Sequence, residues 1–214
     1  MKHFHPRQNH AGQPVELDAP SQPTALSTWA DPHQIATVTP AGPMPESLNG
    51  IAVSTWTGVP DTAAAWNELA APDHSTFSEP PLVPVPGKPP ASGVVILEDD
   101  GRVWVVSPSN AYGGYVNTFP KGKLDPGMDL RANALKEAHE ESGLRVELTG
   151  FLCDSVRSTS VTRYYTARRV GGNPADMGWE TQAVHLVPRE QLAGFVTHPN
   201  DLVVRQALQA RLGK

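Results

Sequence analysis

The sequence predicts an α/β fold in which a mixed β-sheet lies between helices on both faces. Three observations carry this prediction. Short apolar runs rich in β-forming residues recur between residues 93 and 187, a helical segment near residue 135 separates them, and a second helical segment closes the chain. Mixed strands with helices on both sides pack as an α/β/α sandwich. A proline-rich extension precedes this fold.

Each element of the expected fold has a local signal. Two apolar runs, 93–97 and 102–107, are joined by Glu98-Asp-Asp-Gly101, which is a hairpin signal. The loop Tyr112-Gly-Gly-Tyr115 then leads to a helix that ends at Gly143. Further strands are expected over residues 144–154, 156–170 and 183–187, a short helix near 189–192, and a final helix over 201–212.

The chain divides into four segments by composition. Residues 1–24 are polar and rich in residues that interrupt helices and strands, so we expect them to be disordered. Residues 25–71 hold three tryptophans and predict a small N-terminal lobe of unknown role. Residues 72–90 are a proline-rich linker that favours extended polyproline II structure. Residues 91–214 carry the expected α/β domain.

The N-terminal lobe has two local signals of its own. Residues 48–56 predict a turn and a strand, and residues 62–70 predict a short helix capped by Asp61. Its apolar content is small for an independent core. We therefore expect the lobe to pack against the α/β domain or a second subunit, where it would cover a pocket.

Composition excludes several classes of protein. A net charge of −5 over 214 residues argues against a general nucleic-acid binder, but not against a small phosphorylated ligand. Cys153 is the only cysteine, which excludes a disulfide framework and a thiolate zinc site. No run approaches the roughly 18 apolar residues of a membrane span, and the N-terminus lacks a signal-peptide core. We expect a cytoplasmic protein without a membrane partner.

Three glutamates of the central helix are the strongest candidates for chemistry. Glu137, Glu140 and Glu141 are spaced i, i+3 and i+4, so they share one helix face. Like charges at this spacing repel unless a cation lies between them, and oxygen ligands suit a hard divalent ion. A solvated surface face is the alternative. Leu130 and Ala134 lie on the same side, which favours partly desolvated carboxylates at the edge of a cleft.

The segment from Gly122 to Leu144 resembles the Nudix box, the motif of hydrolases that cleave nucleoside diphosphates linked to another group. That motif is Gly, five residues, Glu, seven residues, and then Arg-Glu-apolar-any-Glu-Glu-any-Gly-apolar. The run Lys136-Glu137-Ala138-His139-Glu140-Glu141-Ser142-Gly143-Leu144 closes it without a gap. The resemblance extends more loosely over residues 91–214, and it implies the Nudix-type α/β/α sandwich.

Two positions depart from the motif. Met128 stands where the family has its first Glu, and Lys136 stands where it has Arg. Those two side chains are paired in the family, so the contact between loop and helix is lost or rebuilt here. Asp125 or Asp129 could replace the missing carboxylate, and Asp129 could instead cap the helix.

The resemblance implies a metal-dependent pyrophosphohydrolase that cleaves the phosphoanhydride of a nucleoside diphosphate derivative, with Mg²⁺ or Mn²⁺ as cofactor. Glu137, Glu140 and Glu141 would bind the metal, and Glu140 and Glu141 would be catalytic. Glu180, which precedes the strand expected over 183–187, is a third catalytic candidate as general base, or else an exposed loop acid. The candidate substrates are ADP-ribose or another nucleotide sugar, a dinucleoside polyphosphate and a damaged nucleoside triphosphate.

Five residues near the box are candidates for binding this small-molecule nucleotide. Lys121 and Lys123 flank Gly122 before the helix N-terminus, which itself favours anions. Arg157, Arg163 and Tyr165 lie on the extended run that follows, where Arg163 and Tyr165 share a face. Packing is the alternative role for the tyrosine. A homodimer is possible.

A second function competes with the enzyme: a catalytically silent sensor or regulatory module that keeps the fold and binds a nucleotide without cleaving it. The departures at Met128 and Lys136 favour the sensor. The three intact glutamates favour the enzyme.

Overall fold

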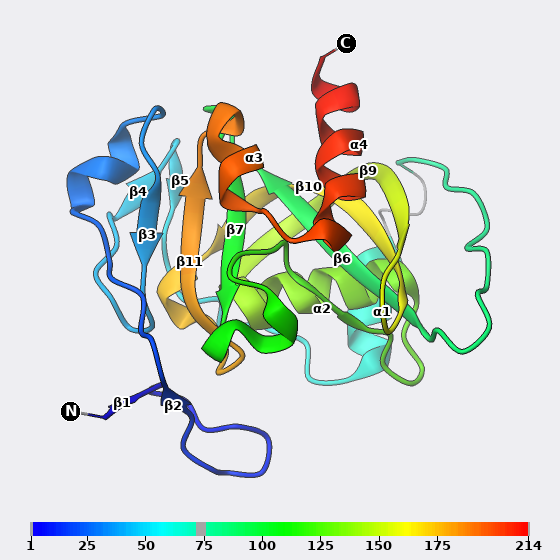
Figure 1. The fold of residues 1–214 in the computed structure, drawn as a ribbon, viewed down its shortest axis with the longest axis horizontal. Helices are drawn as coiled ribbons and strands as arrows, with labels where there is room; N and C mark the ends of the chain where they lie inside the picture. Colours follow the sequence, from blue (N-terminus) through cyan, green and yellow to red (C-terminus); the bar gives the residue numbers. More distant parts are fainter. Residues whose placement is uncertain (1, 72–75, 214) are drawn as a thin grey trace.

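A seven-stranded mixed sheet forms the centre of the computed structural model, which describes residues 2–71 and 76–213 (Figure 1). The strand order is β3-β11-β7-β6-β10-β9, and β8 pairs with β6 beside this path. Pairing is parallel between β10 and β6 and antiparallel elsewhere in the sheet. The strands are β3 (Ala36–Val38), β6 (Pro90–Leu97), β7 (Val103–Pro108), β8 (Lys121–Lys123), β9 (Leu144–Val156), β10 (Val161–Gly172) and β11 (Thr181–Val187).

Helices cover both faces of this sheet. Helices α1 (Ala63–Ala70) and α2 (Leu130–Ser142) lie on one face, and α3 (Leu192–Phe195) and α4 (Leu202–Leu212) lie on the other (Figure 1). Alternate residues of β6 serve the two cores, since Val94 packs in the cluster that contains α2, whereas Val95 packs with α4. The predicted α/β/α sandwich is therefore confirmed.

Most predicted elements of the main domain form close to their expected bounds. The hairpin signal is confirmed, because β6 and β7 are antiparallel and Gly101 takes a positive φ of 86° in the turn between them. The strand expected over 156–170 begins later, at Val161, because the Arg157 N–H bonds to the Ser160 carbonyl at 2.8 Å and closes a turn. None of the helices in residues 2–71 and 76–213 is both long and apolar enough to span a bilayer.

The N-terminal lobe is part of the sandwich rather than a separate body. Strand β3 pairs with β11 and so extends the main sheet at its edge. Strands β4 (Ser47–Leu48) and β5 (Ile51–Ala52) form a tight hairpin around Asn49 and Gly50, which both have positive φ. The expected helix is present as α1, but the prediction that Asp61 caps it is wrong. The cap is Thr62, whose hydroxyl accepts the Ala65 N–H at 3.2 Å.

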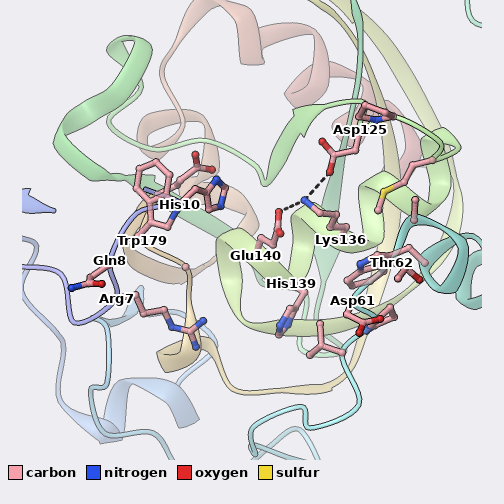
Figure 2. Close-up of a pocket in the computed structure, with 18 residues that line it drawn as sticks. Arg7, Gln8, His10, Asp61, Thr62, Asp125, Lys136, His139, Glu140 and Trp179 are labelled. Atoms are coloured by element: carbon pink, nitrogen blue, oxygen red, sulfur yellow. Dashed lines mark hydrogen bonds and ion pairs between the residues drawn. The ribbon is translucent and has the colours of Figure 1, made fainter. Parts of the chain in front are cut away.

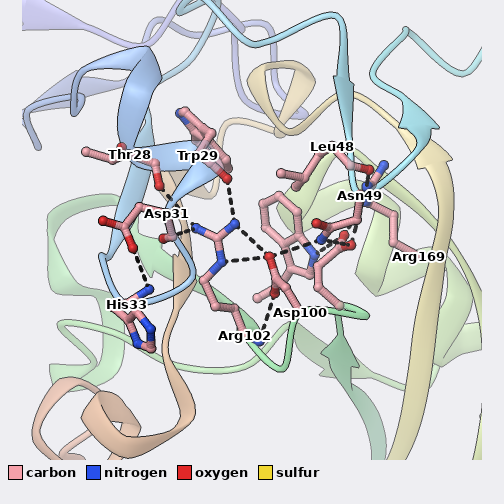
Figure 3. Close-up of polar contacts among 11 residues, drawn as sticks. Thr28, Trp29, Asp31, His33, Leu48, Asn49, Asp100, Arg102 and Arg169 are labelled. Atoms are coloured by element: carbon pink, nitrogen blue, oxygen red, sulfur yellow. Dashed lines mark hydrogen bonds and ion pairs between the residues drawn. The ribbon is translucent and has the colours of Figure 1, made fainter.

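Buried ionic contacts fasten the lobe to the β6–β7 hairpin (Figure 3). Arg102 is 1% exposed and donates to the carbonyls of Thr28, Trp29 and Asp31 at 3.2, 2.6 and 3.1 Å. Its guanidinium also pairs with Asp100 at 2.8 Å. A second buried pair joins Arg169 to Glu98, and Arg169 also donates to the Leu48 carbonyl at 2.7 Å. Because buried charges require partners, these contacts hold the lobe in one position.

The structure differs from the expected disorder at the N-terminus. Strands β1 (His3–Phe4) and β2 (Glu16–Leu17) pair in an antiparallel hairpin, and the His5 N–H donates to the Val15 carbonyl at 2.8 Å. In the expected linker, residues 72–75 lie outside the described residues. Residues 76–89 contain no helix and only an isolated bridge between Val85 and Lys88.

Candidate active site

The loop between β8 and α2 presents the helix to the site. Asp129 caps α2, because its carboxylate accepts the Ala132 N–H at 2.7 Å. At the other end Gly143 adopts the left-handed conformation, with φ of 69° and ψ of 1°. A Cβ there would lie 2.2 Å from the Asn173 carbonyl oxygen, so only glycine fits. Of the two roles open to Asp129, the structure places it in the capping role.

Glu137 lies against the backbone of β8, the strand that precedes the loop. A Cβ on Gly122 would lie 2.2 to 2.4 Å from the Glu137 carboxylate atoms, so the absence of a side chain makes this contact possible. Glu137 is 7% exposed. Burial, and next the charge of Glu141, raise its pKa well above the usual value. The carboxylate therefore lies in a place that penalises its negative charge.

Glu141 lies beside the same strand. Its carboxylate accepts the Lys121 backbone N–H at 3.0 Å. Burial raises the pKa of Glu141 to about 7, although the Lys121 charge and this hydrogen bond oppose the increase, and Glu180 and Glu140 add to it. The acids of this site therefore interact electrostatically with one another.

Glu140 lies at the solvent side of α2 and faces the turn that carries Glu180. The Gly178 N–H donates to the Glu140 carbonyl at 2.7 Å, and a Cβ on Gly178 would lie 2.5 Å from that oxygen. This contact brings Trp179 and Glu180 to the last turns of the helix. Desolvation raises the pKa of Glu180, His10 lowers it, and Glu140 raises it further.

Lys136 connects the helix to the loop. Its ammonium group pairs with Asp125 at 3.1 Å and with Glu140 one turn further along α2 (Figure 2). Burial lowers the Lys136 pKa, but the contacts with Glu140 and Asp125 outweigh it, so the pKa is raised overall. The link between loop and helix is therefore rebuilt around Asp125. Met128 packs partly buried against the core beneath.

Lys136, Glu140 and Glu180 line a cleft of about 660 Å³ (Figure 2), whereas Glu137 and Glu141 lie outside its lining. One wall consists of the loop and α2, with Asp125, Met128, Lys136, His139 and Glu140. The lobe contributes residues 59–63 and Trp66. The opposite wall consists of the turn 178–180 and of three residues from the N-terminal hairpin, Arg7, Gln8 and His10.

The donor set of this site fits a hard divalent cation. Its side-chain groups are carboxylates, and burial, together with the charges of neighbouring acids, raises the pKa of Glu137 and of Glu141. As they stand, however, no three acidic, histidine or cysteine side chains within the described residues are arranged to hold an ion. Glu140 is turned toward Lys136, and it would have to leave that pair to act as a ligand.

The structure brings only some of the candidate substrate-binding residues to the site. Lys121 lies beside Glu141, with its ammonium group 4.7 Å from the Tyr115 ring centre, and Lys123 is exposed on β8. Arg157 is buried and donates to Asp201 at 3.0 Å. It lies in an internal ion pair outside the cleft lining.

Arg163 and Tyr165 also lie away from the cleft. The Arg163 guanidinium makes two hydrogen bonds of 2.8 Å to Asp154, and Tyr165 is fully buried in the core under α2. These contacts give both side chains a structural role. The expected alternation is present, since Tyr164 packs in the core on the opposite face.

Sequence reasoning did not find the side chains that the N-terminal hairpin brings to the cleft. The edge of His10 contacts Trp179, with ring centres 5.5 Å apart and planes at 84°. Arg7 and His10 are more than 160 residues from Trp179 in the chain, so no local spacing connects them. The basic character of the first ten residues was the one available signal.

A mixed sheet between helices, with three carboxylates of one helix beside a polar cleft, defines an α/β-sandwich protein with an acidic candidate active site. The family model described as the NUDIX domain matches residues 87–208, which is more than half of the 214 residues. The chain therefore belongs to the NUDIX family.

Curated relatives and solved structures are similar to parts of this chain. The RNA pyrophosphohydrolase of Caulobacter vibrioides (strain NA1000 / CB15N) is 36% identical over 95 residues, which is 44% of this chain and 52% of that protein. The RNA pyrophosphohydrolase of Novosphingobium aromaticivorans is 33% identical over 66 residues, which is 31% of this chain and 41% of that protein. The chain thus spans about half the length of the curated relatives it matches.

Structural similarity extends over more of the chain. The crystal structure of a NUDIX hydrolase from Nitrosomonas europaea matches with a TM-score of 0.50 and 18% identity, over 62% of this chain and 77% of that one. At this identity the likeness concerns the fold alone.

Proposed function

We propose that this protein is a metal-dependent pyrophosphohydrolase that cleaves the phosphoanhydride bond of a nucleoside diphosphate derivative. The observation that carries the proposal is the group of Glu137, Glu140 and Glu141 on α2, where Glu137 and Glu141 lie against β8 and Glu140 lines the cleft. Membership of the NUDIX family and the names of the two RNA pyrophosphohydrolases support phosphoanhydride chemistry.

A divalent cation would bind to the carboxylates of Glu137, Glu140 and Glu141, and we propose Mg²⁺ or Mn²⁺. When bound, such an ion neutralises the diphosphate oxygens and lowers the pKa of a coordinated water. The raised pKa values of Glu137 and Glu141 support this assignment, because a cation beside the two acids would relieve their repulsion.

The remaining groups would position the substrate and remove a proton. Glu180 borders the cleft, and its raised pKa suits a base that accepts a proton from the attacking water. Lys121 lies on β8 next to Glu141, at the C-terminal end of α2, and is a candidate for contact with a phosphate. Lys123 is exposed on the same strand and is a further candidate for this contact.

The substrate class stays open between three groups of compounds. ADP-ribose and nucleotide sugars, dinucleoside polyphosphates, and damaged nucleoside triphosphates all carry the required bond. The names of the curated relatives add RNA as a further candidate substrate. The net charge of −5 makes a long RNA the least favoured, because few cations are available for its backbone.

The alternative is a sensor that binds a nucleotide without cleaving it. The departures from the motif at Met128 and Lys136 were its main support. Asp125 pairs with Lys136 at 3.1 Å, so the loop keeps an ionic link to the helix. The two departures from the motif therefore no longer favour a catalytically inactive site.

Product analysis by mass spectrometry tests the proposal. Wild type and Glu141→Gln are incubated with each substrate class, with Mg²⁺ or Mn²⁺ and with EDTA. We expect metal-dependent release of a nucleoside phosphate by wild type and its loss in the variant, whose circular dichroism is unchanged. A folded, metal-binding wild type that hydrolyses no member of the panel would favour the sensor.

A further inference from the structure

The N-terminal hairpin, residues 2–18, has its own internal support. Besides the pairing of β1 with β2, Lys2 forms an ion pair with Glu16 at 2.8 Å. In the loop, the Asn9 carboxamide oxygen accepts the N–H groups of Ala11 and Gln13 at 3.0 and 2.9 Å. The hairpin is therefore held by its own hydrogen bonds.

Asn110 fastens this hairpin to the sandwich. Its side-chain amide donates to the Glu16 carbonyl at 2.8 Å, and its amide oxygen accepts the Asp18 N–H at 2.9 Å. Asn110 has left-handed backbone angles, φ 55° and ψ 33°, which asparagine tolerates better than most residues. This reciprocal contact fixes where the hairpin lies on the body.

A hydrogen bond to His5 fixes the backbone at Arg7. His5 is 4% exposed, and its ring nitrogen Nδ1 accepts the Arg7 N–H at 3.0 Å. The Arg7 side chain lines the cleft near His139, on α2 (Figure 2). Within residues 2–71 and 76–213, no carboxylate forms an ion pair with the Arg7 guanidinium.

The cleft is lined by both acidic and basic side chains, with Lys136 on the α2 wall and Glu180 on the same wall as the hairpin residues. The α2 wall holds Glu140, and the turn holds Glu180, whereas the hairpin contributes Arg7 and His10. A ligand that fits both walls has an anionic end for the guanidinium and a second anionic part that reaches the glutamates through a cation. Guanidinium groups bind phosphate oxygens well, since two N–H groups can donate side by side.

We propose that the N-terminal hairpin selects the substrate, with Arg7 and His10 binding a phosphate beyond the diphosphate that is cleaved. The inference rests on the proposed function and narrows it: the preferred substrates are nucleoside polyphosphates with three or more phosphates. Nucleotide sugars and ADP-ribose have only two phosphates, so they leave Arg7 without a partner.

The test compares diadenosine tetraphosphate and ATP with ADP-ribose as substrates of the full chain. Arg7→Met raises KM for the two polyphosphates about tenfold and changes kcat little, as expected for one lost charged hydrogen-bond contact. It leaves KM for ADP-ribose unchanged. Arg7→Lys recovers part of the polyphosphate affinity, because the charge returns without the paired N–H groups.

Two further variants separate the role of Arg7 from general effects. Lys2→Met removes the same charge from the same hairpin outside the cleft. Because the Lys2–Glu16 pair is largely exposed and stabilises the hairpin little, the KM values for all three substrates stay unchanged. Asn110→Gly keeps the left-handed turn but removes both hydrogen bonds to the hairpin. It weakens polyphosphate binding although Arg7 is present. Equal losses for ADP-ribose and polyphosphates in Arg7→Met, or no loss for either, would overturn the inference.

A binding measurement keeps this test independent of turnover. Calorimetry with inorganic tripolyphosphate and pyrophosphate in Mg²⁺ buffer compares wild type with Arg7→Met. The inference predicts that only tripolyphosphate binding weakens in the variant. Wild type without turnover contradicts the proposed function, whereas tripolyphosphate binding that does not depend on Arg7 contradicts the role of the hairpin.

Discussion

The Lys136 ammonium lies 3.1 Å from the Asp125 carboxylate, and the same ammonium contacts Glu140 one turn further along α2. Lys136 therefore connects the loop before the helix to a candidate metal ligand. The carboxylate at position 125 replaces the one that the motif has at position 128, where Met128 stands. The ion pair between the loop and α2 is therefore kept, with Asp125 as its acid.

This arrangement predicts opposite effects for its two partners. Asp125→Asn leaves Lys136 to Glu140 alone, so the metal concentration for half-maximal turnover rises about threefold, on the scale of an exposed ion pair. Lys136→Met removes the cation that pairs with Glu140, so the metal concentration for half-maximal turnover does not rise. Titrating turnover with Mn²⁺ checks both variants. An equal rise of the half-maximal Mn²⁺ concentration in both variants would mean that the pair only joins the loop to the helix.

A Cβ at Gly122 is expected to affect chemistry more than stability. In Gly122→Ala the new atom would lie 2.2 to 2.4 Å from the Glu137 carboxylate, which must move away. Because a side-chain end can rotate, unfolding free energy falls by only about 1 kcal/mol. Turnover falls on the order of 100-fold, as for a misplaced active-site group. Gly194→Ala is the control, since a Cβ there meets nothing within 4 Å.

The acidity of Glu141 predicts how stability depends on pH in metal-free protein. Its pKa of about 7 lies above the usual 4.5, so between these values the folded state binds a proton that the unfolded state lacks. The contribution of Glu141 to unfolding free energy therefore declines as pH rises toward 7. Glu141→Gln removes this decline.

Urea unfolding in EDTA at pH 5 and pH 8 measures the difference. From pH 5 to pH 8, the unfolding free energy of Glu141→Gln should increase relative to that of wild type by on the order of 1–3 kcal/mol. Parallel pH profiles for the two proteins would show that the Glu141 carboxyl is not perturbed.

Removal of Arg102 should loosen the N-terminal lobe. Arg102→Met removes a buried guanidinium that bonds to three backbone carbonyls and pairs with Asp100, which costs about 3–5 kcal/mol of unfolding free energy. The control is Arg168→Met, because Arg168 pairs with Glu147 where both side chains are more than half exposed. That change should cost about 1 kcal/mol or less in the same denaturation experiment.

The sequence best predicted those features that depend on residues close together in the chain. The i, i+3 and i+4 spacing of the glutamates, the Asp129 cap and the glycine that ends α2 all depend on neighbours within one or two turns. The cap of α1 was assigned one residue too early, to Asp61 instead of Thr62, because both residue types cap helices well. Local rules therefore located the helices and left their ends uncertain by a residue.

Distant contacts were beyond prediction from pattern. Nothing in the first ten residues indicates that Asn110 holds the hairpin or that His10 meets Trp179. The roles suggested for Arg157 and Arg163 followed from their place on the extended run after the box, which cannot reveal that Asp201 and Asp154 bind their guanidinium groups. Each of these contacts joins residues that only the folded sheet brings together.

The most direct test of the central claim measures Mn²⁺ binding and phosphoanhydride hydrolysis on the same samples of wild type and Glu141→Gln. We predict that wild type binds Mn²⁺ and that its hydrolysis rises with occupancy. In the variant both should fall together while the fold is retained. Hydrolysis by Glu141→Gln at the wild-type rate, or hydrolysis that persists in EDTA, would contradict a metal-dependent reaction at the α2 glutamates.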